Sequence, residues 1–459
     1  MKIVGGIYTR MKQSRFGIVL PIILVSYFMI LLDNSIVFTS TVKIAQNLNM
    51  GPQALSWVTN AYVLTFGGLL MLGGRAGDVF GRRRIFLLGL IIFSLGSLMV
   101  GLSVNGIMMI AMRALQGIGS AVLAPTTLAL LMDSYQGTMR TRAIIYYGAT
   151  GGLGASFGLV IGGLIASYTS WRWGFLLNVP IGIIMVILTI KFISAGRQKN
   201  LGKIDWLGSL LSVIGIVLLV FGINGASHPL ITVVIALLFL SVFVWQEKHT
   251  EQPIMPLRLF VDRERSSAYV ARFFFLCAMI SYFFLTPQAM QHVYHFTPLM
   301  AAIGFLPETV PQFIFATLVS RLNVRFSNVQ IMMTGTIITT LGLLMASVVK
   351  IQGGYFWAIA VPMVIIGIGQ GFTLSPLTVS GVANTDPEIA GSASGVVNTV
   401  HQIGSSFGLS VITLLTTGLA SPVLTYDRSV ELMTGFMVLS MIAVVNIMFG
   451  KRATEEAFN

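Results

Sequence analysis

Apolar runs of about 20 residues recur along this chain, and they constrain its fold more than any other feature. The first of them begins with 17 residues, 16–32, that include no charged side chain. About 20 apolar residues are enough for a helix to cross the hydrocarbon core of a bilayer. The fourteen runs, with approximate edges, are 16–38, 54–73, 85–104, 107–131, 143–166, 173–193, 206–226, 229–246, 267–290, 299–320, 329–349, 355–378, 391–416 and 430–449. We therefore expect an all-α membrane protein with fourteen transmembrane helices.

The composition leaves no room for a soluble alternative. Of the 459 residues, 55% are hydrophobic and only 9% are charged, whereas a soluble protein carries roughly 25% charged residues. The longest predicted loops, about 193–205 and 247–266, are too short to fold as domains of their own. The chain is therefore expected to consist almost entirely of membrane-spanning helices and short connections.

Lysine and arginine are distributed unevenly between alternate loops. Most of the 28 basic residues fall in the two tails and in the loops that follow even-numbered runs. Cytoplasmic loops are enriched in these residues, so we expect both termini to be cytoplasmic in a multi-pass protein of the cell (inner or plasma) membrane. The net charge of +13 reflects this bias. Because the basic residues are spread over many short loops, they suit an anionic lipid leaflet rather than nucleic acid.

Two glycine-containing motifs occur twice, each time 250 residues apart. The segment GASFGL at 154–159 returns as GSSFGL at 404–409, and GIGSAVLAPTT at 117–127 returns as GIGQGFTLSPLT at 367–378. The first six runs therefore match the last six in order, as two parallel six-helix repeats with a two-helix insert (6+2+6). The predicted domains are a six-helix bundle at 1–200, the insert at 201–250 and a second bundle at 251–459. Such halves are typical of transporters that bind substrate at the interface between them.

Four motifs resemble those of one family. The segment GRAGDVFGRRR at 74–84 and the segment RALQGIGSA at 113–121 are similar to signatures of the major facilitator superfamily. LLDNSIV at 31–37 and WRWGFLLNVPIG at 171–182 resemble its fourteen-helix drug:proton antiporter branch, which includes bacterial quaternary-ammonium and multidrug exporters. The resemblance implies a major facilitator fold, alternating access and proton-coupled export.

Two acidic residues lie inside the apolar runs, Asp33 in the first and Glu308 in the tenth. An intramembrane charge costs at least about 2.5–3.5 kcal/mol, so it is a functional hypothesis by default. A buried carboxyl can exchange a proton or pair with a cation, and competition between the two would couple transport to protons. The alternatives are a permanent salt bridge for Asp33 and a structural pair with Arg272 for Glu308.

Three further polar residues lie within the runs. The resemblance implies that Arg113 is the partner that poises Asp33, and the alternative is hydrogen bonding to backbone carbonyls. Arg272 lies near a predicted helix end and could extend to the membrane surface. His401 could titrate near neutral pH, although a hydrogen-bonded core histidine is the simpler interpretation.

These considerations define the predicted site. We assign proton coupling to Asp33, Glu308 and Arg113. The predicted substrate-binding residues are Ile30, Asp33, Asn34, Gln116, Phe305, Glu308 and Gln312. The resemblance of 74–84 to the loop signature implies a cytoplasmic gate of Gly74, Asp78, Gly81, Arg82 and Arg83, where glycine at 81 would permit a tight turn. The alternative for the arginines is plain charge bias at the cytoplasmic surface.

The predicted function is proton-coupled antiport that exports several lipophilic, cationic drugs or dyes. We expect a monomer that interacts with small-molecule substrates, protons and the lipid bilayer, without cofactor, metal or nucleic acid. The alternatives are a transporter dedicated to one metabolite and a non-transporting membrane receptor or scaffold. An enzyme is not expected, because the sequence shows no nucleophile–base pair, metal-ligand cluster or phosphate loop in a credible context.

Overall fold

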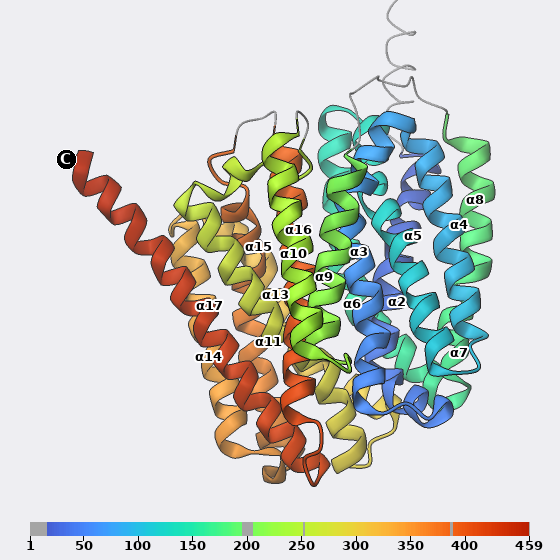
Figure 1. The fold of residues 1–459 in the computed structure, drawn as a ribbon, viewed down its shortest axis with the longest axis vertical. Helices are drawn as coiled ribbons and strands as arrows, with labels where there is room; N and C mark the ends of the chain where they lie inside the picture. Colours follow the sequence, from blue (N-terminus) through green and yellow to red (C-terminus); the bar gives the residue numbers. More distant parts are fainter. Residues whose placement is uncertain (1–15, 195–204, 251–252, 386–388, 459) are drawn as a thin grey trace, which may run out of the picture.

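The computed structural model describes residues 16–194, 205–250, 253–385 and 389–458. These residues form long helices joined by short turns (Figure 1). The helices of the first part of the chain are α2 (Val19–Leu48), α3 (Pro52–Phe80), α4 (Arg82–Gly101), α5 (Gly106–Ser134), α6 (Gly137–Tyr168), α7 (Trp171–Leu176), α8 (Asn178–Phe192), α9 (Trp206–Ile223) and α10 (Pro229–His249). The remainder are η1 (Leu257–Phe260), α11 (Arg263–Val293), α12 (Pro298–Ile303), α13 (Leu306–Leu322), α14 (Asn328–Val349), η2 (Ile351–Gly353), η3 (Phe356–Ala360), α15 (Val361–Gly381), α16 (Ala390–Thr416) and α17 (Pro422–Phe458).

The expected number of membrane-spanning helices is wrong. Within the described residues, twelve helices are long and apolar enough to cross a membrane, rather than fourteen. The two predicted runs that are missing from this set correspond to α6 and α16, which are helical but carry many glycine, serine and threonine residues. Both helices pack along neighbours, α6 on α2 and α16 on α3 and α11. Small and polar residues are favoured at such contacts between helices, which lowers their mean hydropathy.

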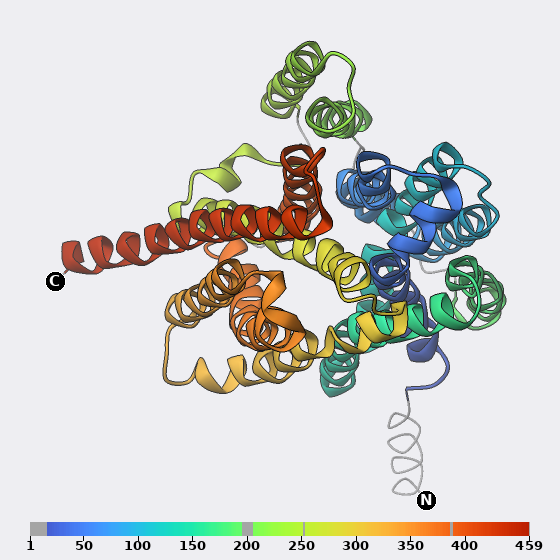
Figure 2. The same ribbon diagram turned by 90° about the horizontal axis from the view of Figure 1, so that it is seen from below.

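The helices form two groups with a separate pair beside them. Helices α2–α8 lie on one side and α11–α17 on the other, while α9 and α10 pack on each other at the edge between the groups (Figures 1 and 2). The predicted domain limits at 200 and at 251 fall within residues 195–204 and 251–252, outside the described part of the chain. We name the two ends of the molecule after the turns that mark them, the Gly81 end and the Gly51 end.

The repeated glycine motifs make equivalent contacts in the two groups. Gly154 and Gly158 of α6 lie against Leu31 and Ser35 of α2, where an added Cβ atom would overlap the neighbouring helix. Gly404 and Gly408 of α16 lie in the same way against Phe273 and Cys277 of α11. Each copy of the motif therefore brings its helix into close contact with the first long helix of its group.

Helices α3 and α16 hold the two groups together along their length. The Asn60 side chain donates to Ser410 Oγ at 2.8 Å, and the Thr399 hydroxyl donates to the Gly67 carbonyl at 3.2 Å. Further contacts occur toward the Gly51 end, where the Leu299 N–H donates to Ser167 Oγ at 2.8 Å. The two groups are therefore in direct contact at the Gly51 end.

Asn224 attaches the pair α9–α10 to the first group through two hydrogen bonds. The indole N–H of Trp57 donates to the Asn224 carbonyl at 2.7 Å, and the Asn224 side chain donates to Ser56 Oγ at 2.7 Å. Asn224 is fully buried just after the end of α9. Its two bonds fix the turn between α9 and α10 on the start of α3.

Candidate functional site

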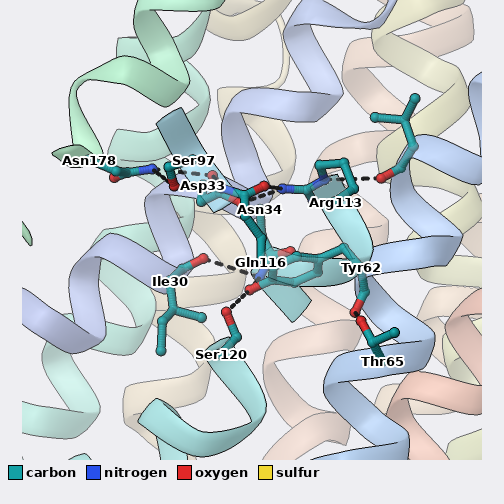
Figure 3. Close-up of polar contacts among 11 residues, drawn as sticks. Ile30, Asp33, Asn34, Tyr62, Thr65, Ser97, Arg113, Gln116, Ser120 and Asn178 are labelled. Carbon is teal, nitrogen blue, oxygen red and sulfur yellow. Dashed lines mark hydrogen bonds and ion pairs between the residues drawn. The ribbon is translucent and has the colours of Figure 1, made fainter. Parts of the chain in front are cut away.

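Asp33 and Arg113 form a buried ion pair inside the first helix group (Figure 3). Asp33 lies in the middle of α2 and Arg113 in the first half of α5, and their side chains are 0% and 1% exposed. Arg113 Nη1, which donates to Asp33 Oδ2, also donates to Gln116 Oε1 at 2.8 Å. Arg113 Nε donates to the Val58 carbonyl at 3.0 Å. Arg113 therefore contacts both the Asp33 carboxylate and a backbone carbonyl, while its role in proton coupling stays a prediction.

The second carboxylate oxygen of Asp33 is held by two amides. Gln116 Nε2 donates to Oδ1 at 2.9 Å and Asn178 Nδ2 donates to the same atom at 3.2 Å. Gln116 also donates to Ser97 Oγ at 2.6 Å. The network thus joins α2, α3, α4, α5 and α8 around one carboxylate (Figure 3). Charged groups buried in this way are tolerable only when their hydrogen-bonding capacity is satisfied.

Tyr62 lines the side of the network that faces α3. Its ring centroid lies 4.2 Å from Arg113 Cζ, a cation–π contact. Its hydroxyl lies 2.7 Å from Ser120 Oγ and 3.5 Å from Asn34 Nδ2. Gly117 permits this arrangement, because a Cβ atom there would overlap Tyr62 and Thr65. The glycine of the α5 motif therefore helps to place the aromatic ring beside the guanidinium.

Sequence reasoning missed the side chains of Ser97, Tyr62, Ser120 and Asn178 in this network. Asn178 lies within the motif WRWGFLLNVPIG, which we used only for its family resemblance. As a polar residue within the predicted apolar run 173–193, Asn178 could have been marked as a candidate, although its contact with Asp33 could not. Of the predicted substrate-binding residues in this group, Asp33, Asn34 and Gln116 lie in the network, and the Ile30 carbonyl accepts from Asn34 at 3.2 Å.

Glu308 is fully buried in the second helix group, in the first turn of α13. The expected continuous helix at 299–320 is interrupted at Gly304 and Phe305, so that Glu308 lies near a helix N-terminus inside the molecule. The positive end of the helix dipole at such a terminus favours a carboxylate. Glu308 does not pair with Arg272, whose side-chain bonds go to other residues. The sequence-based alternative of a Glu308–Arg272 pair is therefore wrong.

A short chain of amides contacts Glu308. Gln370 Nε2 donates to Glu308 Oε1 at 2.6 Å, and Gln312 Nε2 donates to Gln370 Oε1 at 3.1 Å. The other carboxyl oxygen, Oε2, has no hydrogen-bond partner within the described residues. Gly367 lies against the main chain of Glu308, which brings α15 close enough for Gln370 to reach the carboxyl group. The buried Glu308 thus retains one free acceptor, in contrast to Asp33.

Phe305 occupies the break that precedes α13. Its ring is buried against Tyr282 and Phe283 of α11, with centroid separations of 6.0 and 4.8 Å. Phe283 in turn contacts Phe38 of α2 at 6.0 Å. These rings form an apolar connection between the groups that contain Asp33 and Glu308.

The predicted gate residues gather at the Gly81 end of the first group. Arg82 contacts Asp78 at 2.9 Å and Asp133 at 2.7 Å, and it donates to the Ala129 carbonyl at 3.1 Å. Gly81 has a φ of 97°, a conformation that favours glycine. These contacts tie α3 and α4 to the end of α5.

The two other predicted gate residues lie beside this cluster. Arg83 donates to the Ile190 carbonyl of α8 at 2.8 Å. Gly74 lies opposite Pro125 of α5, where an added Cβ atom would be 3.6 Å from the ring. These contacts of Arg82 and Arg83 are made to residues of the first helix group, so a role as a gate stays a prediction.

The molecule has two groups of membrane helices, with a buried ion pair in one and a buried carboxyl in the other. This arrangement is typical of polytopic membrane transporters. Comparison with known families makes the assignment specific, because the model of the Major Facilitator Superfamily matches residues 23–409. The chain belongs to this superfamily of membrane transporters. A multi-pass transporter of this kind is expected in the cell membrane.

Several curated relatives carry names that refer to drug export. The chain is 32% identical over 417 residues to the cephamycin export protein CmcT of Amycolatopsis lactamdurans, covering 88% of this chain and 86% of that one. It is 28% identical to the puromycin resistance protein pur8 of Streptomyces alboniger, with 93% and 88% covered. Multidrug resistance protein 3 of Bacillus subtilis is 27% identical, with 88% and 80% covered.

Solved structures support the fold. A POT family transporter in complex with 5-aminolevulinic acid superimposes with a TM-score of 0.71 at 15% identity, over 94% of this chain and 97% of that one. The inward-open xylose transporter XylE from E. coli gives a TM-score of 0.65 at 12% identity, over 94% and 95%. At these identities the similarity shows a shared fold alone.

Proposed function

We propose that this protein exports lipophilic, positively charged drugs or dyes across the cell membrane in exchange for protons, by alternating access of a site between the two helix groups. The observation that carries the proposal is the pair of fully buried carboxyls, Asp33 and Glu308, one in each group. The names of the relatives add support, since they refer to cephamycin, puromycin and multidrug resistance.

The two carboxyls are suited to different roles. Both oxygens of Asp33 are engaged, by Arg113 on one side and by Gln116 and Asn178 on the other. A proton on Asp33 would remove the charge that holds Arg113 and would loosen the contacts between α2 and α5. We therefore assign to Asp33 the coupling of protonation to helix movement. Glu308, with its free Oε2 atom, is the better contact for a cationic cargo.

The direction of transport follows from the topology that the charge bias predicts. With the Gly81 end and both termini in the cytoplasm, cargo would enter between the groups from that end and leave at the Gly51 end after rearrangement. A proton that moves inward across 100 mV supplies about 2.3 kcal/mol to this cycle. The Arg82 cluster would stabilise the first group as one body during the movement. A monomer contains both carboxyls and is sufficient for the mechanism.

Transport by purified protein in liposomes tests the proposal. An imposed pH gradient should drive movement of a lipophilic cationic dye in the wild type. Asp33→Asn should abolish gradient-driven movement while retaining dye binding, and Glu308→Gln should weaken dye binding. Asp427→Asn is the matched control, because the Asp427 carboxyl accepts from the Ile351 N–H at 3.0 Å and belongs to neither the Asp33 network nor the Glu308 amide chain.

Two results would contradict the proposal. Equal transport by the wild type and Asp33→Asn would remove Asp33 from the coupling mechanism. A folded wild type that moves no cationic dye under a gradient would favour the alternative of a transporter dedicated to one metabolite.

A further inference from the structure

One buried arginine of the second helix group has no anionic partner among the residues that the structure describes. Arg272 on α11 is only 6% exposed. Its Nη1 atom donates to Thr378 Oγ1 of α15 at 2.9 Å, and Nη2 lies 3.1 Å from His401 Nδ1 of α16. Its Nε atom has no hydrogen-bond partner in the described part of the chain. The expectation from sequence that Arg272 extends to the membrane surface is therefore wrong.

Two other buried arginines show what a satisfied guanidinium looks like in this protein. Arg113 is paired with the Asp33 carboxylate. Arg265, which precedes Arg272 by two turns on the same helix α11, is 4% exposed. Its three nitrogens donate to Leu259 O, Ala383 O, Asn384 O, Thr385 Oγ1 and Arg258 O. Each of the three nitrogens of Arg265 thus donates to at least one neutral acceptor, whereas Arg272 has two neutral partners and an Nε atom without one.

The partners of Arg272 leave its charge uncompensated. A guanidinium stays protonated in proteins, and burial of such a charge is unfavourable without a counter-charge. Because Arg272 donates to Nδ1, His401 acts as an acceptor there and contributes no negative charge. The Thr378 hydroxyl is neutral as well. Within the described part of the chain, no anion contacts this guanidinium, and the planar fork of arginine is suited to bidentate binding of a carboxylate.

The site is close to the surface and to the contact between the groups. Thr378, which covers one side of the guanidinium, is exposed. His401 is half-buried, and its neighbour Gln402 packs against Gly67 of α3 in the first group. A ligand that displaces Thr378 from Arg272 would therefore lie among α11, α15 and α16.

We propose that Arg272, with Thr378 and His401, binds the carboxylate group of a lipophilic cargo molecule. This proposal rests on the export function proposed above. It adds molecules that carry a carboxylate to the range of substrates of that exporter. Anion binding itself depends neither on a pH gradient nor on the direction of transport, so it can fail or succeed independently of the proposed antiport.

The test is equilibrium binding of dansylglycine to the purified full-length protein, followed by dansyl fluorescence. Dansylglycinamide is the matched neutral probe, since it differs in the carboxylate alone. We expect the wild type to bind dansylglycine at least about tenfold more tightly than the amide, the order of one charge-assisted contact. Arg272→Gln should abolish this preference, and Arg272→Lys should retain part of it. Arg265→Gln should keep the preference, because Arg265 is engaged by its own carbonyl acceptors.

Three results would overturn the proposal. Equal binding of the two probes by the wild type would show that no carboxylate site exists, and this comparison needs no variant to fold. Retention of the preference in a folded Arg272→Gln protein would place the anion elsewhere. Complete displacement of dansylglycine by physiological chloride would assign the site to a free inorganic anion instead of cargo.

Discussion

Replacement of Arg113 by glutamine tests whether Asp33 and Arg113 stabilise the fold as a coupled pair, so that loss of one charge destabilises the protein more than loss of both. The substitution removes the guanidinium that contacts Asp33, Gln116 and the Val58 carbonyl. Asp33 would keep only the two amide donors of Gln116 and Asn178. Loss of one partner from a buried pair costs about 3–5 kcal/mol, because the remaining charge stays buried and uncompensated.

The double variant Asp33→Asn/Arg113→Gln removes both charges together. This variant leaves no unpaired charge. It loses about two neutral hydrogen bonds, each worth about 1 kcal/mol. We therefore expect the double variant to lose about 2 kcal/mol, less than Arg113→Gln alone. The free energy of unfolding, measured by denaturant titration in detergent micelles for the wild type, both single variants and the double variant, gives the interaction energy directly. The reasoning is refuted if the two single losses simply add in the double variant.

Three further predictions concern packing and the second group. Gly367→Val should disrupt the contact of α15 with the Glu308 main chain and reduce the yield of folded protein on size-exclusion chromatography. Gly435→Ala should leave the yield unchanged, because no atom lies within 4 Å of a Cβ atom added there. Equal yields of the two variants would contradict the close approach at Gly367. Trp57→Phe should lower unfolding stability by about 1 kcal/mol through loss of the bond to the turn after α9, and no loss would show that this bond is unimportant. Arg82→Lys should increase proteolysis near the Gly81 end, since lysine cannot bridge Asp78, Asp133 and a carbonyl as the guanidinium fork does, and unchanged cleavage would argue against that role.

The candidate site was only partly accessible from the sequence. Asp33, Glu308 and Arg113 stood out because charged residues are rare inside apolar runs, and family resemblance suggested that Arg113 serves Asp33. The structure places these two in contact. It also adds Asn178 and Ser97, which are ordinary polar residues on α8 and α4. Their role depends on which helices surround α2, and no local pattern reports that.

The fold shows the same division. Long uncharged runs determined that the chain is a helical membrane protein, because partition into a bilayer depends on the summed hydropathy of each segment. The count of spanning helices was overestimated, since α6 and α16 combine helix-packing glycines and polar residues with a run of apolar ones. The break between α12 and α13 was also missed, although it places Glu308 at a helix N-terminus.

The sequence by itself thus determined the membrane environment, the repeated glycine motifs, the family resemblance and the two acids that any mechanism must explain. Only the tertiary structure decided the partners of the buried charged residues. Both carboxylate oxygens of Asp33 accept hydrogen bonds, Glu308 accepts one from the Gln370 amide and keeps its other oxygen free within the described residues, and Arg272 contacts neutral groups. The physical reason is one of range. Transfer of a segment into lipid is set by its own residues, whereas the stability of a buried charge is set by side chains that come from helices distant in the chain.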